Sequence, residues 1–443
     1  MIMKNGMKMK KCLLLAVALM LTGAANAQET LELTLNKAIE IALADNPTIR
    51  VADEEIVLKK VANREAWMTL LPELSVSGSW QYTIKAPELK LGGQSFRMGD
   101  DDVSTAAGVA TLSLPVFAPA VYKSMSITKT DILLAQEKAR ASRLDLVNQV
   151  TKAYYQLMLT QDSYEVLKRS YALAEENYNV VNSRYEQGLV SEFDKISAEV
   201  QMRNVKPSVV SAENGVRICK IQLKVLMGIT EDINLVVNEK LNNYETMVFT
   251  NQLDNDNFGL ENNSTMRQFE LNADILKKNV GLAWSNFMPS LGVALTGQYQ
   301  SMYNNHWNVF DYSWVGSSQL TFSLSVPIFR ASNFTKLKTA RLQRTQLELS
   351  RIDTERKLNM QVESYKNNML ASSEQVLSNK EAMNQADKAL SISKKRYEVG
   401  KGTVLELNSS QVALTQAELT YSQSIYDYLT AKADLDLVLG RGE

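Results

Sequence analysis

Residues 183–194 read SRYEQGLVSEFD, and residues 395–406 read KRYEVGKGTVLE. Each stretch ends a long helical pattern, and the two copies lie 212 residues apart. In both, a glycine stands where a left-handed residue ends a helix, and a Ser or Thr followed three residues later by an acid stands where the next helix is capped. The sequence therefore predicts two copies of one tight reversal between helices, which points to a duplicated fold.

The duplication extends over most of the chain. The segment 46–74 (NPTIRVADEEIVLKKVANREAWMTLLPEL) aligns with 263–291 (NSTMRQFELNADILKKNVGLAWSNFMPSL) at an offset of 217 residues. LSLPVF at 112–117 aligns with LSVPIF at 324–329 at an offset of 212, which is also the offset of the two turns. Each half is expected to contain a helix, two strands, a long helix and a returning helix, with a longer loop in one half.

This duplication divides the chain into four parts. Basic residues, an apolar stretch and Ala-Asn-Ala at 25–27 predict a signal peptide at 1–27, so the chain is expected to be exported. The first structural repeat is expected at 28–228 and the second at 263–443. The insertion at 229–262 has no counterpart and is expected to form short elements.

Four segments are expected to be strands, at about 73–84, 103–116, 290–300 and 314–328. They alternate apolar and polar residues, although 103–116 does so less cleanly and is rich in alanine. A soluble antiparallel sheet with one buried face would show the same pattern. No helix outside the long coiled pattern remains to cover the apolar face, so an exported chain favours an outer-membrane barrel. Four strands cannot close a barrel, and an open edge is not tolerated in lipid. The chains must therefore share one barrel, and a trimer leaves more room for an aqueous lumen than a dimer.

Aromatic residues lie in or beside these segments, as expected of the belts that flank the apolar band of a membrane barrel. The membrane-interface candidates are Trp80, Tyr82, Tyr299, Trp307 and Trp314.

The residue inventory excludes several classes of protein. The formal net charge is −1, and removing the lysines of the signal makes the chain more acidic, which argues against nucleic acid. Cys219 is the only cysteine after the signal, and His306 is the only histidine. No recognised catalytic, nucleotide-binding or metal-binding motif occurs, so we expect no enzyme activity, no cofactor and no metal site.

The long helices carry heptad patterns that suit close antiparallel packing, as in a tunnel wall or a solitary coiled coil. At the turns, the carboxylates of Asp194 and Glu406 are first expected to cap the returning helices. A ring of such turns could also form a constriction in which the carboxylates select and gate. The two roles are compatible.

Taken together, these motifs resemble the TolC-like outer-membrane efflux protein family. The resemblance rests on LTLNKAIEIALADNP at 33–47, W-x4-P before a strand, LPVF and VPIF after the strands, and the doubled RYExG. It implies a mainly α chain with a membrane β-barrel portion, four strands per chain, and a homotrimer with a twelve-stranded barrel. It further implies outer-membrane lipid around the barrel and a helical tunnel through the periplasm. A periplasmic adaptor and an inner-membrane pump would meet its tip, and 229–262 would be the equatorial insertion.

The resemblance also assigns residues to the tip. The gate and turn residues it implies are Tyr185, Gly188, Asp194, Tyr397, Gly400 and Glu406, and the adaptor-contact candidates are Arg184 and Arg396. Two positions depart from the family pattern, because Gly402 replaces an arginine and Ser409 replaces the second acid of the constriction. The closed tip is therefore expected to keep the tyrosine–acid contact of the family, without the arginine and without the second ring of acids. The chain is interpreted as the passive outer-membrane duct of an efflux or secretion system, and the alternative is a non-conducting coiled-coil scaffold anchored by a shared barrel.

Overall fold

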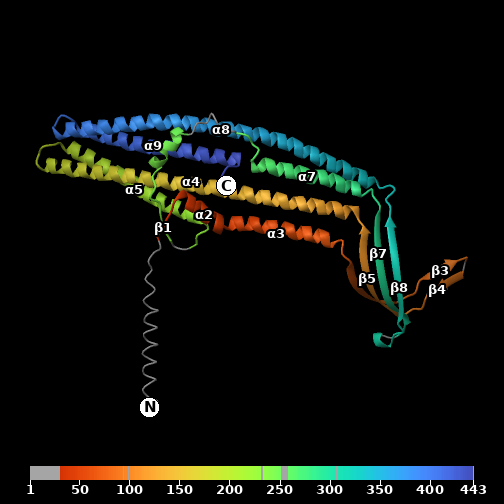
Figure 1. The fold of residues 1–443 in the computed structure, drawn as a ribbon. Coiled ribbons are helices and arrows are strands. Elements are labelled where there is room, and N and C mark those ends of the chain that lie inside the picture. Colours follow the sequence, from red (N-terminus) through yellow and green to blue (C-terminus); the bar gives the residue numbers. More distant parts are fainter. Residues whose placement is uncertain are drawn as a thin grey trace, which may run out of the picture.

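The protein forms a long bundle of helices that continues at one end into a curved sheet (Figure 1). The two repeated turns lie at the opposite end of the bundle from the sheet (Figure 1). This computed structural model describes residues 30–92, 94–97, 99–230, 233–250, 258–305 and 308–442. The signal peptide expected at 1–27 lies outside the described residues.

The two halves have matching long elements. The first half contains α2 (Leu35–Asp45), α3 (Pro47–Met68), β2 (Glu73–Thr83), β5 (Val103–Phe117), α4 (Pro119–Glu186) and α5 (Glu192–Met227). The second half contains α7 (Ser264–Ser285), β7 (Ser290–Asn304), β8 (Val315–Ser325), α8 (Ala331–Glu398) and α9 (Val404–Leu439). The long helices α4 and α8 have 68 residues each, and α5 and α9 have 36 each. Because the paired helices have equal lengths, the offset between the two repeats stays at 212 residues along them.

Short elements fill the connections. The strands β3 (Glu88–Leu91) and β4 (Gln94–Arg97) form a hairpin in the longer loop of the first half, between β2 and β5. Four-residue strands carry too little alternation to be predicted from the sequence. Between the halves, β6 (Asn234–Val236) pairs in parallel with β1 (Thr30–Glu32). The short 3-10 helix η1 (Leu241–Tyr244) and the short α-helix α6 (Glu245–Thr250) follow β6, and a further 3-10 helix, η3 (Val309–Asp311), lies between β7 and β8.

The main sheet is antiparallel with the strand order β2-β5-β7-β8, which confirms four long strands in the chain. Its register places one leucine from each strand in a single row across the sheet: Leu74, Leu112, Leu295 and Leu320. The neighbouring row on the opposite face is polar: Ser75, Thr111, Thr296 and Gln319. The leucines are 40–69% exposed. This face of the sheet is therefore mainly apolar, and the chain leaves most of it uncovered.

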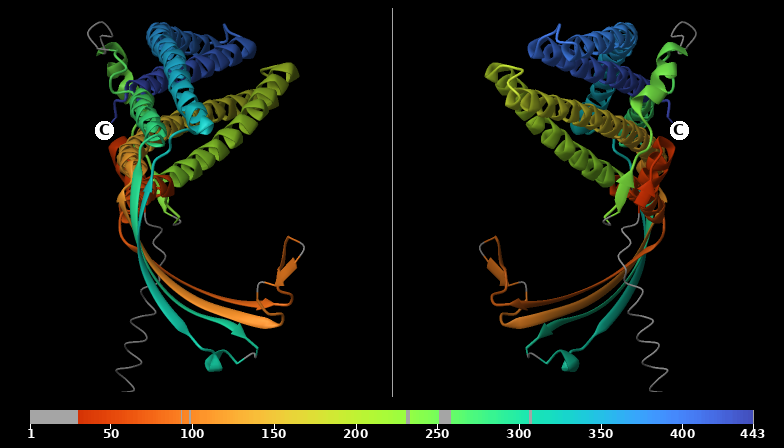
Figure 2. Two further views of the ribbon diagram at one scale, coloured as in Figure 1. Left: turned by 90° about the vertical axis from the view of Figure 1, so that its right-hand side faces the viewer. Right: turned by 90° about the vertical axis from the view of Figure 1, so that its left-hand side faces the viewer.

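The sheet is an arc when seen along the helices (Figure 2). Within the part of the chain that the structure describes, the outer strands β2 and β8 each pair with one neighbour only. Their remaining backbone N–H and C=O groups need partners. In lipid, each unpaired backbone group would destabilise the protein by several kcal/mol, on the order of the cost of burying an amide without a hydrogen bond. The geometry is that of a barrel segment rather than of a closed sheet.

The main core lies midway along the bundle, where α2, α4, α5 and α9 meet. The buried hydroxyl of Tyr154 on α4 donates to Glu239 at 3.1 Å, and Tyr244 donates to the same carboxylate at 2.6 Å. Burial, followed by the charge of Glu239, raises the pKa of Tyr154 well above its ordinary value. Lys380 on α8 pairs with Glu245 at 2.6 Å. The segment after β6 therefore ties α4 to α8. Among the described helices, none combines the length and apolarity needed to cross a bilayer.

A helix junction occurs twice and aligns the two repeats. Asn46 caps α3 and donates its amide to Leu226 O at 2.7 Å, in the last turn of α5. Asn263 caps α7 and donates to Val438 O at 2.7 Å, in the last turn of α9. Each returning helix then ends on a left-handed glycine, Gly228 at φ +72° or Gly440 at φ +69°. Every repeat thus closes on itself through one asparagine and one glycine.

Candidate functional site

The two turns at the tip end their helices in the same way. Gly188 adopts φ +70°, and its N–H donates to Tyr185 O at 2.8 Å. Gly400 adopts φ +72°, and its N–H donates to Tyr397 O at 3.1 Å. The residue after each glycine also donates to its helix, Leu189 N to Arg184 O and Lys401 N to Arg396 O. These bonds give partners to carbonyls in the last turn of both helices. The glycines are thus the turn residues that the repeated motif predicts.

The caps of the returning helices differ, although their sequences match. Ser191 and Asp194 form a full capping box, with Asp194 N donating to Ser191 Oγ at 3.2 Å and Ser191 N donating to Asp194 Oδ2 at 3.3 Å. At the second turn, Glu406 N donates to Thr403 Oγ1 at 3.1 Å. The Glu406 carboxylate instead faces Arg396, with 3.7 Å between Nη2 and Oε2. The expectation of an identical device at both turns is therefore wrong for the Glu406 side chain.

This asymmetry predicts different effects of removing the two acids. Both N-caps, Ser191 and Thr403, remain when the acids are removed. Asp194→Ala should destabilise its hairpin by about 1 kcal/mol, because it removes the carboxylate that accepts from both Ser191 N and Ser191 Oγ. Glu406→Ala should cost less, because an exposed ion pair contributes about 0–1 kcal/mol. Limited proteolysis at the two turns measures the difference, and faster cleavage at 400–403 in Glu406→Ala than at 188–191 in Asp194→Ala would contradict it.

A small apolar core joins the two hairpins at the tip. It contains Val181 of α4, Ala198 of α5, Tyr397 of α8, and Val404 and Leu407 of α9. Val181 is completely buried, and Tyr397 is 8% exposed. This cluster is separate from the main core of the bundle, so the tip has its own packing.

Tyr397 meets Arg184 rather than an acid. The guanidinium carbon of Arg184 lies 5.2 Å from the centre of the Tyr397 ring, which is a cation–π contact between α8 and α4. The buried hydroxyl of Tyr397 has no hydrogen-bond partner of acceptable geometry among the described residues. Burial raises the pKa of Tyr397, and the charge of Arg184 opposes that shift. The expected tyrosine–acid hydrogen bond is therefore absent here, and Asp194 caps its own helix.

Polar contacts continue from the tip along the line where α4 meets α9. Gln411 Nε2 donates to Ser170 O at 2.7 Å, and Asn177 donates to Asn408 at 3.1 Å. Nearer the middle of the bundle, ion pairs join Arg169 to Glu418 at 3.2 Å and Lys152 to Asp434 at 3.0 Å. Polar seams exchange partners with water more readily than apolar cores do.

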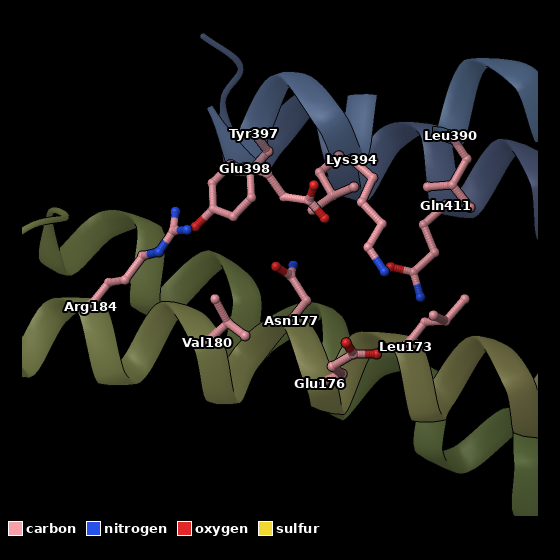
Figure 3. A pocket seen from close by; sticks show the side chains of 11 residues that line it. Leu173, Glu176, Asn177, Val180, Arg184, Leu390, Lys394, Tyr397, Glu398 and Gln411 are labelled. Atoms are coloured by element: carbon pink, nitrogen blue, oxygen red, sulfur yellow. The ribbon is translucent and has the colours of Figure 1, made fainter. Parts of the chain in front are cut away.

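A cavity of about 150 Å³ lies between the hairpins just above the tip core (Figure 3). Leu173, Val180 and Leu390 supply apolar walls, while Arg184 and Lys394 extend into the same space from opposite helices. The hairpins therefore touch through a few side chains around a gap. Such a contact can separate without disrupting the helices themselves.

The remaining sequence-predicted residues of the tip are placed as follows. Tyr185 is half-buried, and Lys195 of α5 lies 4.9 Å from its ring centre. Arg396 is exposed, and its guanidinium also donates to Lys401 O at 3.3 Å. Ser409 is exposed on α9. A Cβ on Gly402 would lie 3.1 Å from both Arg396 Cβ and Tyr397 N, so an arginine there would crowd this turn.

The aromatic candidates lie at the end of the sheet that is far from the helices. Trp80 and Tyr82 stack on one face of β2 with 6.2 Å between ring centres. Tyr299 of β7 is 65% exposed, and Trp314 precedes β8 with 41% exposure. Trp307 lies outside the described residues. Among the described residues, no group of three or more His, Cys, Asp or Glu side chains is arranged to hold a metal ion.

A duplicated chain whose helical hairpins run into an arc of four strands, with one apolar and one polar face, defines a subunit of an outer-membrane channel. The chain belongs to the outer membrane efflux protein family, whose sequence model matches residues 38–229 and 259–441. The family lies in the outer membrane, as the names of its curated relatives also state.

Curated relatives and solved structures agree with this assignment. The chain is 21% identical to the outer membrane protein TolC of Escherichia coli strain K12, over 98% of this chain and 87% of that protein. It is 23% identical to the alkaline protease secretion protein AprF of Pseudomonas aeruginosa, over 93% of this chain and 85% of the relative. The crystal structure of the outer membrane protein VceC from Vibrio cholerae matches with a TM-score of 0.71 and 16% identity, over 92% of this chain and 96% of that one. The VceC likeness supports the fold.

Proposed function

We propose that the protein is the passive exit duct of a tripartite efflux or secretion system, and that its helical tip is the gate. The observation that carries the proposal is the sheet, which has one lipid-like face, one polar face and two edge strands with single neighbours. Three copies would supply twelve strands, enough for a barrel with an aqueous lumen. The homotrimer is thus the smallest assembly that satisfies the edges and leaves a channel.

The polar face of the sheet supports a duct that discriminates little between solutes. On β2 this face carries Glu73, Ser75, Ser77, Ser79 and Gln81, and on β8 it carries Ser317, Gln319, Thr321 and Ser323. Apart from Glu73, at the end of β2 nearest the helices, these side chains are neutral, and rings of charge are what give pores their ion selectivity. We therefore assign the choice of cargo to the inner-membrane pump.

The tip is suited to gating because little apolar packing joins the hairpins there, and the contacts farther along the line between α4 and α9 are polar. The Arg184–Tyr397 contact and the apolar cluster around Val181 hold the α8–α9 hairpin against the α4–α5 hairpin. The two hairpins also share the tie provided by the segment after β6, farther up the bundle. Separation of the hairpins below that tie would widen the tip while the middle stays assembled.

The proposed partners are a periplasmic adaptor and the inner-membrane pump that drives transport. Arg396 is exposed at the tip and remains a candidate for contact with the adaptor. Arg184 is half-buried and engaged with Tyr397, so its proposed role is in the latch. Chemical cross-linking in cells from a cysteine at position 396, followed by identification of the captured protein, tests the adaptor contact.

Single-channel recording separates the duct from the alternative, a non-conducting scaffold anchored by a shared barrel. Purified oligomer in a planar bilayer is expected to give discrete, ohmic conductance steps that grow when the tip is opened by mutation. A scaffold would be silent in the wild type and in the opened variant. Silence in both, with the oligomer shown to be intact and inserted, would overturn the duct.

A further inference from the structure

The connection between β7 and β8 is pinned to one face of the sheet. Tyr312 is 5% exposed, and its hydroxyl lies 2.5 Å from Ser104 Oγ on β5. Trp80 Nε1 on β2 donates to the same hydroxyl at 3.4 Å. The connection therefore folds back across two other strands and is held there by a buried hydrogen bond.

The register identifies that face as the apolar one. Trp80 and Tyr82 stack on β2 and lie opposite Ala106 and Ser104 of β5. Positions separated by two residues share a face of a strand, so these residues lie on the same side as Leu74. In the view along the helices, the short turn of this connection (teal) lies on the convex side of the arc (Figure 2). Tyr312 is thus bound outside the arc, on its apolar surface.

The turn presents apolar side chains from this position. Phe310 is 96% exposed, and Val309 is 40% exposed. Polar groups hold the turn in shape, because Asn308 accepts from Phe310 N and donates to Asp311. A phenylalanine that is fully exposed to water is unfavourable, and here it continues an apolar surface that already requires lipid.

We propose that Val309 and Phe310 insert into the acyl chains of the outer leaflet, so that this connection anchors the barrel rim in lipid instead of covering the channel mouth. The inference rests on the proposed barrel, because it takes the apolar face of the sheet as the lipid face. The partner is the acyl-chain region of a bilayer. Its polar boundary would lie at Tyr312 and Trp314, whose rings lie 6.4 Å apart.

Spin labelling tests the placement. In a Cys219→Ala background, a nitroxide is attached to Phe310→Cys and, in separate variants, to Leu320→Cys and Gln319→Cys. Leu320 and Gln319 are neighbours on β8 and point to opposite faces of the sheet. In phosphatidylcholine vesicles the labels at 310 and 320 are expected to collide more often with oxygen than with a water-soluble nickel chelate, and the label at 319 should show the reverse.

The outcomes are separable. A label at 310 that behaves like 319, while 320 behaves as lipid-exposed, overturns the anchor but leaves the barrel. A label at 320 that behaves like 319 overturns the barrel itself. Tyr312→Phe provides an independent check, because loss of the hydroxyl bound to Ser104 should free the connection and increase the nickel accessibility of the label at 310 several-fold. An unchanged accessibility in Tyr312→Phe would contradict the pinning by this hydrogen bond.

Discussion

Replacing Tyr397 with alanine is expected to open the tip and to increase the single-channel conductance several-fold. The side chain is 8% exposed and packs with Val181 and Leu407 in the small core that joins the hairpins. Removing a buried aromatic side chain costs about 3–5 kcal/mol. A loss of that size would shift the closed–open equilibrium of the tip by about a hundredfold or more, at 1.4 kcal/mol per factor of ten.

The control is Tyr397→Phe, which keeps the ring and removes only the hydroxyl. That buried hydroxyl makes no hydrogen bond of acceptable geometry among the described residues, although the Arg184 guanidinium lies close to it, so its loss should leave the tip closed. The ring face that meets Arg184 also remains. Equal conductance of the Phe and Ala variants, both raised above the wild type, would show that the hydroxyl closes the tip and that the packing does not.

The duplicated plan and the strands could be predicted because each depends on a local period. Leu74, Val76, Trp80 and Tyr82 alternate with polar residues, so β2 was evident from the sequence alone. The strand β5 is rich in alanine and alternates less clearly, yet its alignment with the second repeat predicted it. The structure places it at Val103–Phe117, against an expected 103–116. Internal repetition thus supplied what the period alone did not.

The details of the site could not be predicted in the same way, because they depend on competition between partners. The motifs Ser191-x-x-Asp194 and Thr403-x-x-Glu406 predict the same capping box. Only the second has an arginine within reach of its carboxylate, at position 396 on the preceding helix. Whether a side chain caps a helix or pairs with a cation is decided by geometry across the turn, which a local pattern does not contain.

Long-range contacts explain the other omissions. Tyr312 meets Ser104, which is 208 residues away along the chain, and neither residue stands out in the sequence. The family resemblance makes Arg184 a candidate for contact with an adaptor, and the structure shows a contact that the resemblance did not give, with Tyr397 on the other hairpin. In both cases the partner comes from the other repeat, and alignment of the repeats pairs equivalent residues rather than residues in contact.

Gly228→Ala is expected to cause the largest loss of stability among single glycine substitutions in the first repeat, and Gly188→Ala is its matched control. Both glycines are left-handed, at φ +72° and +70°, so each alanine pays about 1–2 kcal/mol for its backbone. At Gly188 the added Cβ meets nothing within 4 Å, whereas at Gly228 it would lie 2.8 Å from Asp45 O and 3.2 Å from Asn46 Cα.

The clash at Gly228 would displace Asn46, which caps α3 and holds the end of α5. Gly228→Ala should therefore be destabilised both by backbone strain and by loss of this junction. Gly188→Ala should be destabilised by backbone strain alone. The measurement is the temperature at which the purified oligomer in detergent loses its helical signal in far-ultraviolet circular dichroism. A clearly lower midpoint for Gly228→Ala than for Gly188→Ala is expected. Equal midpoints would mean that the junction relaxes around the added methyl group and does not determine how the repeat closes.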